Sequence, residues 1–468
     1  MNDATLDYIR RHASDDVRQL ALRPVPDGVV LRQALTQIEG RQLAARKLPA
    51  WAATDGLLFP PRLSLEQCSS EATAQYKQAL VRRLLASLPS VSSPSLPPAS
   101  SPSLPPASSP SLPPASFPSL PSASSPSLPS ASSSVPSPSL PPAAVAVASA
   151  TVPPVCFVDL TAGFGVDFAA LAPLFARATY VERQEVLCDI ARHNLPLLGL
   201  PEAEVRCSSA EEVLQELADN PVTLLFLDPA RRDAAGRKVA LIEDCMPDVC
   251  ALQDQLRAAA HYVLIKLSPM LDLTAALRSM QGVVEAHVVS VDGECKELLL
   301  LLAAEASVAE PLIHCSYSPT VPPLTFRMSE ERSSSAVMAA GLQQYLYEPD
   351  AAILKAGAFK VLCQRYPVSK LAPDTHLYTS DEFVVDFPGR RWKVMDSCSF
   401  AKSELRRLLS DVPAADLTLR GFPGSVAQLR KQLHLREGGS AHFIATTLAD
   451  GSRHLIRVER EAHPLPLL

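Results

Sequence analysis

Residues Val158–Asp167 have the sequence VDLTAGFGVD, which joins two apolar runs through a turn with two glycines. The run before the turn predicts a strand, and the run after it predicts a helix. Glycine at such a turn can adopt a positive φ angle, and without a Cβ atom it lets the backbone approach a ligand closely. In a parallel sheet these turns lie at the carboxyl ends of the strands, where ligands bind. The segment therefore predicts an α/β fold with a ligand site at this turn.

Strand and helix patterns alternate around this turn. Short runs predict five strands at Val155–Leu160, Ala178–Val181, Glu204–Cys207, Val222–Leu227 and Tyr262–Leu267. Longer periodic segments, among them Val186–Leu198 and Val239–Ala259, predict helices. Two further predicted strands, Val284–Val291 and Lys296–Leu302, flank Asp292-Gly293, a dipeptide typical of tight hairpin turns. This order predicts a Rossmann-like, doubly wound parallel sheet that ends in an antiparallel hairpin.

Two acidic residues follow predicted strands at the same edge as the glycine turn. Glu182 ends the second strand, seventeen residues after Gly165, and its carboxylate can accept hydrogen bonds from ribose hydroxyls. The alternative is a solvated carboxylate at a strand end. Asp228 precedes a proline after the fourth strand, either at the rim of the crevice or as the start of a helix. The third glycine of an NAD pattern would fall at Phe168, so that pattern is absent.

In this order and spacing, these features resemble the class I S-adenosylmethionine-dependent methyltransferases, which carry D-x-x-x-G-x-G, an acidic end to strand two and D-P after strand four. More closely, the chain resembles a bacterial family of methyltransferases with a C-terminal THUMP-like domain. In the core, this resemblance rests on Asp159–Asp167 and Asp228–Arg232. Outside the core, the segments that carry it are Ile38–Gln42, Lys47–Trp51, Glu66–Glu71, Tyr347–Ile353, Lys355–Lys360, Arg420–Pro423 and the predicted hairpin around Asp450-Gly451.

The resemblance implies S-adenosylmethionine as the cofactor. It implies that Asp159, Gly163 and Gly165 line its methionine end and that Glu182 binds its ribose. Methyltransferases often have an Asp after strand three for the adenine amine, whereas this chain has Ser209 there, whose hydroxyl can also hydrogen-bond the base. The remaining expected cofactor-binding residues are Phe164, Asp167 and Asp228.

Methyl transfer from a sulfonium is an in-line displacement, so the protein aligns the reactants and removes a proton where one must leave. Asp228 is the first catalytic candidate, for substrate orientation or proton acceptance. Lys266, near the end of a predicted strand, is the second, and a solvated lysine is its alternative. The aromatic residue that follows D/N-P-P in many base-methylating enzymes is missing here. Cys245 and Cys250 are expected on the next helix as buried structural thiols.

The regions before the methyltransferase domain differ sharply in composition. Residues 1–86 predict a helical region, with helical periodicity over Val29–Leu48 and Ala72–Leu85. Residues 87–150 consist almost entirely of Ser, Pro, Leu and Ala and carry no charge, with an eight-residue proline repeat. Frequent prolines remove backbone donors, so this stretch predicts a disordered or polyproline II spacer, with a proline-motif ligand as the alternative. The methyltransferase domain is expected at residues 151–305.

The C-terminal part is expected to contain two regions. Residues 306–389 mix strand and helix patterns, which suggests an α+β connecting region, ferredoxin-like in fold, and residues 390–468 are expected to be the THUMP-like domain. Residues Gly389–Arg436 contain ten Lys/Arg and four Asp/Glu, a net +6 in a chain of −6. The last predicted hairpin of the chain, within residues 390–468, pairs His442–Thr447 with His454–Val458.

THUMP domains bind RNA, so the resemblance implies an RNA substrate, rRNA or tRNA. The candidate phosphate contacts are Arg420, Arg430, Lys431 and Arg436, and an ordinary basic helix face is the alternative. The other hypothesis is a methyltransferase-fold protein that acts on a small molecule or a protein, or that binds RNA without catalysis.

The overall composition argues against several classes of protein: general polyanion binders, secreted proteins, membrane proteins and zinc proteins. A pI near 6.0 does not suggest a general polyanion binder. The N-terminus has no apolar segment of a secretory signal, and no run of eighteen apolar residues is free of charge or proline. The ten cysteines include no CxxC pair and no zinc-ligand spacing. We therefore expect a cytoplasmic protein with reduced thiols, no membrane span and no metal.

Overall fold

The computed structural model describes residues 1–88, 155–230, 241–304 and 308–461. All but the first two residues of the expected spacer at 87–150 lie outside the described residues. Among the described residues, no helix combines the length and apolarity needed to cross a membrane.

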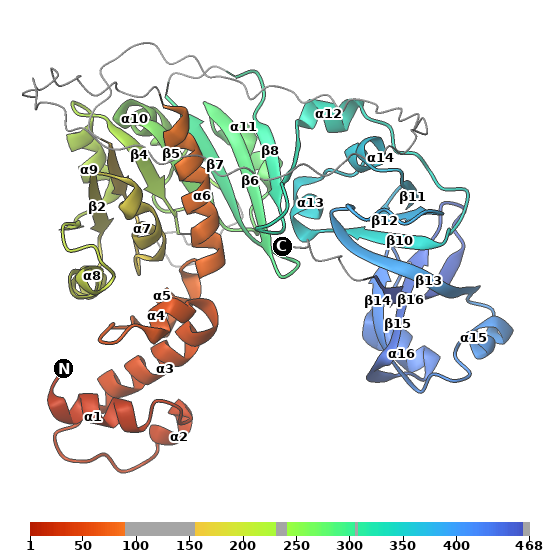
Figure 1. The fold of residues 1–468 in the computed structure, drawn as a ribbon, viewed down its shortest axis with the longest axis horizontal. Coiled ribbons are helices and arrows are strands. Elements are labelled where there is room, and N and C mark those ends of the chain that lie inside the picture. Colours follow the sequence, from red (N-terminus) through yellow and green to blue (C-terminus); the bar gives the residue numbers. More distant parts are fainter. Residues whose placement is uncertain (89–154, 231–240, 305–307, 462–468) are drawn as a thin grey trace, which may run out of the picture. The chain divides into compact units, whose positions relative to one another are not determined.

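The N-terminal region is helical, as the periodicity predicts (Figure 1). Its helices are α1 (Asp3–Arg11), α2 (Val17–Leu20), α3 (Leu31–Lys47), α4 (Pro49–Ala53), α5 (Arg62–Gln67) and α6 (Glu71–Ser87). Helix α3 ends just before Pro49, because proline lacks the donor that would continue the helix and instead occupies the first turn of α4. Within α3, Gly40 packs directly against Phe59, where a Cβ atom would overlap the ring-bearing side chain. This close packing holds α3 against the loop that leads to α5.

The domain after the N-terminal helices contains a nine-stranded sheet in the described residues, with strand order β3-β2-β1-β4-β5-β7-β6-β8-β9. Its strands are β1 (Cys156–Asp159), β2 (Arg177–Glu182), β3 (Glu204–Cys207), β4 (Val222–Leu227), β5 (Ala260–Leu267), β6 (Val283–Val291), β7 (Glu294–Ala303), β8 (Leu312–Ser316) and β9 (Leu324–Phe326). Strands β1 to β5 run parallel, and β7 is antiparallel to β5 and β6. The predicted Rossmann-like sheet with a terminal hairpin is confirmed.

The turn between β6 and β7 shows why the hairpin forms where it does. Asp292 and Gly293 both have positive φ angles, 55° and 75°. This is the geometry of a two-residue hairpin turn, which Asp-Gly adopts with little strain.

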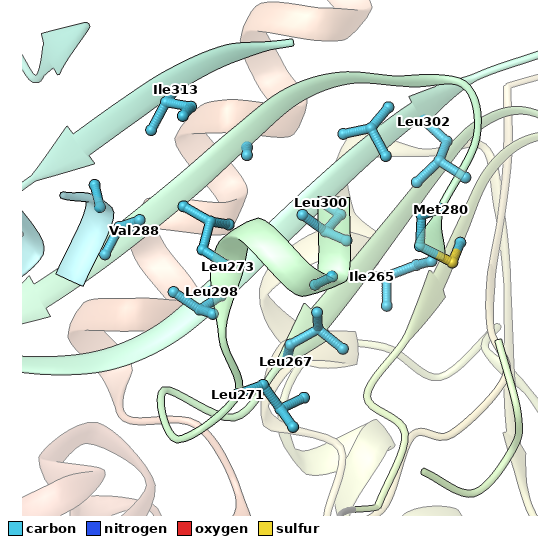
Figure 2. Close-up of a cluster of buried hydrophobic side chains, with 14 of the residues drawn as sticks. Ile265, Leu267, Leu271, Leu273, Met280, Val288, Leu298, Leu300, Leu302 and Ile313 are labelled. Atoms are coloured by element: carbon cyan, nitrogen blue, oxygen red, sulfur yellow. The ribbon is translucent and has the colours of Figure 1, made fainter. Parts of the chain in front are cut away.

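Helices cover both faces of this sheet. They are α7 (Val166–Leu171), α8 (Glu185–Leu197), α9 (Ala210–Leu217), α10 (Gln253–Ala259) and α11 (Leu273–Ser279), with a 3-10 turn at Ala172–Leu174. On one face, α9, α10 and α11 bury apolar side chains against β4 to β7; Figure 2 shows part of this core around Leu273, Leu298 and Leu300. On the other face, α7 and α8 pack with the N-terminal α6, whose Leu80, Val81 and Leu84 join the same buried cluster.

The helix expected at Val239–Ala259 is much shorter than predicted. Only Gln253–Ala259 is helical, residues 241–252 form turns, and residues 239–240 are not described. Pro247 cannot donate the backbone hydrogen bond that a continuous helix requires there. Cys245 and Cys250 therefore lie before the helix and not on it, which corrects that expectation.

The sheet continues past residue 305, where the sequence analysis places the end of the domain. Strand β8 pairs in parallel with β6, and β9 pairs with β8. The apolar side chains of Ile313, Cys315, Leu324 and Phe326 belong to the same core as the preceding strands. Two strands of the expected connecting region thus complete the nine-stranded sheet.

The C-terminal part forms a second sheet of seven strands in the described residues, ordered β11-β12-β10-β13-β16-β15-β14. These strands are β10 (Tyr345–Pro349), β11 (Ser369–Ala372), β12 (Thr375–Ser380), β13 (Gly389–Ser399), β14 (Ala414–Arg420), β15 (Arg436–Thr447) and β16 (Arg453–Arg460). The helices in this part are α12 (Met328–Ser333), α13 (Ala351–Ala356), α14 (Val361–Arg365), α15 (Lys402–Leu408) and α16 (Val426–Leu433). Strands β10 to β12 and β13 to β16 share this sheet because β13 pairs with both β10 and β16.

Candidate functional site

A cavity of about 440 Å³ lies at the carboxyl ends of the parallel strands. Four of its lining side chains come from or directly follow neighbouring strands: Asp159 from β1, Glu182 from β2, Asp228 after β4 and Lys266 from β5. The strand order reverses between β1 and β4, and in open α/β sheets ligands bind at such a switch point. The fold thus collects four of the predicted site residues around one cavity.

The glycine turn forms one wall of this cavity. Gly163 and Gly165 have φ angles of +57° and +87°, which side-chain-bearing residues rarely adopt. The Gly163 N–H donates to Glu182 Oε2 at 3.2 Å, and the Tyr180 hydroxyl donates to the Gly163 carbonyl. The turn is therefore held by β2, its neighbour in the sheet, with its backbone facing the cavity.

Two buried carboxylates suit the polar groups of S-adenosylmethionine. Glu182, 8% exposed, also accepts the Gln184 N–H at 2.9 Å. Asp159 is 1% exposed, and burial raises the pKa of its carboxyl well above the usual range. Its Oδ1 accepts the Thr161 N–H at 3.1 Å, while the buried Oδ2 has no hydrogen-bond partner among the described residues. Such an oxygen in a cavity wall favours a ligand that brings a donor, as the ammonium and ribose hydroxyls of this cofactor do.

Ser209 also lines the cavity but serves as the N-cap of α9. Its hydroxyl accepts the Glu212 N–H at 3.2 Å, and Glu212 Oε2 accepts the Ser209 N–H at 3.0 Å, which completes a capping box. The Ser-x-x-Glu signature of this box is visible in the sequence and predicts this local role. The hydroxyl keeps its own proton for donation to a ligand.

Phe164 and Asp167 point toward the N-terminal helices, although both border the cavity. The Phe164 ring is 4.9 Å from Trp51 and 6.1 Å from Phe59, measured between centroids. Asp167 accepts the Ser69 hydroxyl at 2.6 Å and pairs with Lys77 at 3.2 Å. These two side chains, expected beside the cofactor, therefore bind the N-terminal region to the glycine turn.

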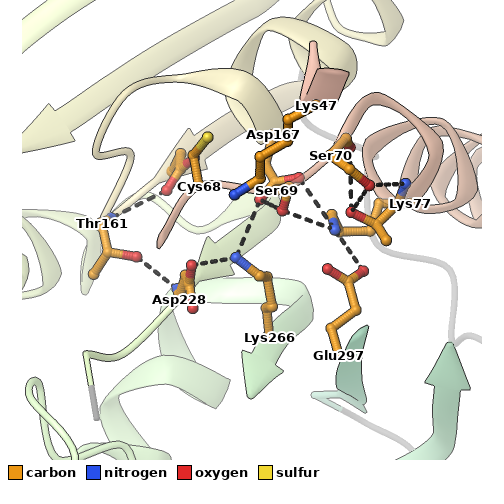
Figure 3. A network of polar contacts seen from close by, with 12 residues as sticks. Lys47, Cys68, Ser69, Ser70, Lys77, Thr161, Asp167, Asp228, Lys266 and Glu297 are labelled. Atoms are coloured by element: carbon orange, nitrogen blue, oxygen red, sulfur yellow. Dashed lines mark hydrogen bonds and ion pairs between the residues drawn. The ribbon is translucent and has the colours of Figure 1, made fainter. Parts of the chain in front are cut away.

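A buried ion network connects α6 to the catalytic candidates (Figure 3). Lys77, fully buried, lies 2.5 Å from Glu297 Oε1 and 3.2 Å from Asp167 Oδ1. Lys266 in turn lies 3.7 Å from Asp167 Oδ2 and forms an ion pair with Asp228. Although burial alone disfavours a charged Asp167, the two lysine ammonium groups hold its pKa below the usual range. If one partner of such a buried network moved away, the charge of the other would be left without compensation, which costs free energy. The ion pair with Lys266 therefore holds the Asp228 carboxylate in position.

The same network determines the protonation state of Lys266. Burial lowers its pKa, but the carboxylates of Asp228 and Asp167 outweigh burial and raise the pKa of Lys266 well above its ordinary value. The ammonium group therefore stays protonated near neutral pH and cannot accept a proton. Lys266 remains a candidate for orienting Asp228 or the substrate.

The N-terminal region supplies a cavity wall that the sequence analysis did not anticipate. Ser64, Gln67, Cys68 and Ser69 all line the cavity. Ser64 and Gln67 lie in α5, and Cys68 and Ser69 follow it. Lys47 holds the end of α5 by donating to the carbonyls of Leu65 at 3.0 Å and Glu66 at 2.8 Å. The only sequence signal was the segment Glu66–Glu71, which carries part of the family resemblance without indicating a role.

The thiol of Cys68 faces this cavity but is not an activated nucleophile. Burial raises its pKa to about 11, so the reactive thiolate is scarce at neutral pH. Burial likewise raises the pKa of Cys250 to about 11. The raised pKa of Cys250 agrees with its interpretation as a structural thiol.

The basic residues of the C-terminal region divide into two groups. Arg420 pairs with the buried Glu348, and Arg430 donates to the carbonyls of Ala415 at 2.9 Å and Arg436 at 2.6 Å. These two guanidinium groups, expected at phosphates, are thus engaged within the domain. Lys431 and the Arg436 side chain are exposed and have no ion-pair partner among the described residues. The latter pair fits a phosphate-binding surface better.

Comparisons with known proteins agree with this architecture. Residues 345–388 match a family of ferredoxin-like domains, and residues 389–460 match a family described as THUMP domain-like. A crystal structure of a candidate methyltransferase from Porphyromonas gingivalis W83 is 30% identical, covers 98% of each chain and has a TM-score of 0.74. A protein of Mycobacterium tuberculosis H37Rv, named as an uncharacterised S-adenosylmethionine-dependent methyltransferase, is 27% identical over 299 residues, 63% of this chain and 78% of its own. Its counterpart in strain CDC 1551 matches to the same extent.

Proposed function

This chain belongs to the class I S-adenosylmethionine-dependent methyltransferases that carry a C-terminal THUMP-like domain, and from this premise we propose that its methyl acceptor is RNA. The observation that carries the proposal is a set of exposed cations on the THUMP-like domain without carboxylate partners among the described residues. They are Lys402, Arg406, Lys431 and Arg436. Phosphates bind such cations and release counterions, which supplies affinity without sequence preference.

We assign the cofactor to the glycine-turn half of the cavity. The Glu182 carboxylate would accept hydrogen bonds from the ribose hydroxyls, and Asp159 Oδ2 would accept one from the ammonium group. The backbone at Gly163 leaves room for the methionine part, whereas Gly165, whose ideal Cβ position lies 3.4 Å from the Tyr180 ring, does not line the cavity and shapes the turn. The Ser209 hydroxyl would donate to the adenine ring. When bound, the cofactor supplies an electrophilic methyl group on its sulfonium. These assignments follow from the unpartnered oxygen of Asp159 and the missing side chains of the turn.

The methyl acceptor would then enter beside Asp228. This carboxylate is 34% exposed at its side chain, so it can reach a substrate and still stay anchored by Lys266. Asp228 would accept the proton that leaves the acceptor nitrogen or oxygen, and Lys266 would hold the carboxylate in position. The end of α5 with Ser64 and Gln67, together with Cys68 after it, would form the opposite wall. The exposed Gln67 amide, which makes no hydrogen bond among the described residues, is available for hydrogen bonds to a base.

The decisive test of the substrate is mass spectrometry of nucleosides from total RNA of a deletion strain and its parent. We expect one methylated nucleoside to be lost in the deletion strain and restored by the wild-type gene but not by an Asp228→Asn variant. Identical nucleoside profiles, together with methyl transfer by the purified protein to a protein or small molecule, would contradict the proposal.

The cations of the THUMP-like domain give a further prediction. Lys431→Ala combined with Arg436→Ala should weaken RNA binding several-fold, and the slope of log affinity against log salt should become shallower by about 0.7–0.9 per lost phosphate contact. Fluorescence anisotropy over a salt series measures both.

The matched control for this experiment is Arg82→Ala combined with Arg278→Ala, which removes the same charge from exposed residues elsewhere in the chain. It should leave the salt dependence unchanged. Equal effects of the two double variants would mean that net charge, and not this surface, governs binding.

A further inference from the structure

A second cluster of ionisable side chains lies away from the cofactor cavity, on strands β6 and β8. Glu285 and His287 are two residues apart on β6 and so share one face of the sheet. His314 on β8 is the direct cross-strand neighbour of His287. Helix α6 covers this face and contributes Tyr76 and Arg83. The sheet thus brings one carboxylate and two imidazoles together under a helix.

The ligand atoms of these three residues converge. Glu285 Oε2 lies 3.1 Å from His287 Nε2 and 3.7 Å from His314 Nε2, and all three atoms lie within 4.8 Å of one another. Ligand atoms in a tetrahedral site are roughly 3.3 Å apart, since each lies about 2.0–2.1 Å from the metal. The two rings stack with centroids 4.5 Å apart and an interplanar angle of 11°, so at least one ring has to rotate before both nitrogens point at one ion.

One of these nitrogens has no partner. His314 is 8% exposed, and its buried Nε2 makes no hydrogen bond among the described residues. An orphaned polar atom at such depth costs free energy unless something binds it. His287 Nδ1, by contrast, is 2.8 Å from the Tyr76 hydroxyl. In the metal-free protein, a proton on His287 Nε2 can be donated to Glu285. When an ion binds, the tautomer with its proton on Nδ1, donated to Tyr76, would leave Nε2 free as a ligand, the support that metal-bound histidines commonly have.

The three groups are also in the protonation states that a metal requires. Burial lowers the pKa of His314 to about 3 and also lowers the pKa of His287, so both imidazoles are neutral at pH 7. Despite its burial, hydrogen bonds from His287 and Arg83 hold the pKa of Glu285 well below its usual range, so the carboxylate is ionised. Metal binding would therefore displace few protons.

We propose that Glu285, His287 and His314 bind a divalent transition metal ion. Two imidazole nitrogens and one carboxylate oxygen form a ligand set typical of zinc. None of the three lines the cofactor cavity, so the ion would be structural and would tie β6 to β8 beneath α6. The Glu285 side chain is 18% exposed, which leaves a solvent-facing position for a fourth ligand.

Arg83 is the competitor for this site. Its guanidinium donates to both carboxylate oxygens of Glu285, at 3.1 Å for Oε1. With its side chain 52% exposed, Arg83 can turn toward solvent when an ion binds. The metal ion and the Arg83 guanidinium therefore compete for the Glu285 carboxylate. If the cluster is a metal site, removal of Arg83 should tighten metal binding; if it is only a structural salt bridge, removal of Arg83 should produce no metal binding.

The test is calorimetric titration of the chelator-treated, full-length protein with Zn²⁺, together with Co²⁺ absorption spectra. We expect one equivalent to bind, with visible cobalt bands but no near-ultraviolet thiolate charge transfer. His314→Gln and Glu285→Gln should each weaken binding on the order of tenfold or more. His442→Gln, a half-buried histidine in the other sheet, is the matched control and should leave binding unchanged.

Arg83→Ala makes the test independent of any folding defect in the buried variants. Removal of this exposed competitor should tighten zinc binding several-fold and raise the thermal midpoint only when zinc is present. The proposal is overturned if the wild type binds no zinc, if His314→Gln binds it as tightly as the wild type, or if Arg83→Ala does not tighten binding.

Discussion

Replacement of Asp228 by Asn should lower the rate of methyl transfer roughly 100-fold or more, while the dissociation constant of the cofactor changes by less than about tenfold. Asp228 lies after β4, its N–H donates to the Thr161 hydroxyl at 2.6 Å, and its side chain forms an ion pair with Lys266. Cofactor contacts are assigned instead to Glu182, Asp159 and the glycine turn. Loss of a group that acts mainly in the transition state lowers turnover more than ground-state binding.

Single-turnover rates with the true substrate and calorimetry with S-adenosylhomocysteine measure the two quantities separately. The asparagine keeps the size of the side chain, and Asp244→Asn, which changes an exposed carboxylate in the loop after β4, is the matched control. If Asp228→Asn turns over at the parental rate, Asp228 has only a structural role. A parallel loss of cofactor affinity would show that Asp228 acts mainly in binding.

Gly163→Val should abolish cofactor binding, with an affinity loss on the order of 100-fold or more. The residue has a φ of +57°, and its ideal Cβ position has only the Thr161 carbonyl nearby, at 3.8 Å. A valine there would not clash with the protein itself but would extend into the cavity. It would also strain the turn by about 1–3 kcal/mol, since β-branched residues resist positive φ angles.

Gly199→Val separates these two effects. Gly199 has a φ of +81° with nothing within 4 Å of its ideal Cβ, and it does not line the cavity. It should therefore lose stability to a similar degree and retain cofactor affinity. Calorimetry and thermal unfolding of both variants measure the difference. Equal binding by wild type and Gly163→Val would refute the placement of the cofactor at this turn.

The sheet and its ligand site could be predicted from local sequence patterns, and the family and the cofactor from the resemblance that these patterns carry. The segment Val158–Asp167 encodes a strand, a glycine turn and a helix within ten consecutive residues, and Asp292-Gly293 encodes its hairpin. Such signals depend on backbone conformations that one or two residues prefer by themselves. The prediction of a helix over Val239–Ala259 was wrong for most of its length. Its apolar periodicity continues through Pro247, but a helical backbone cannot continue there because proline has no N–H to donate.

Contacts between distant segments were beyond the reach of local patterns. Asp167 looked like a cofactor ligand because it belongs to the glycine turn, yet the fold places Lys77 and Ser69 beside it. Likewise, Arg430 looked like a free cation in a basic segment, whereas the fold turns it toward the carbonyls of Ala415 and Arg436. Burial and partner choice depend on segments many residues apart, and no local spacing contains that information.

The sequence by itself determined the succession of strands along the chain and the positive-φ turn, because each depends on the intrinsic preferences of neighbouring residues. With the strands located, it also showed that acidic residues stand at or directly after two strand ends. Only the tertiary structure decided that Gln67 and Cys68 at the end of α5 line the cavity, that Lys266 stays protonated between Asp228 and Asp167, and that His287 is the cross-strand neighbour of His314. These features arise from the exclusion of water and from electrostatic interactions between groups that the chain brings together only when it folds.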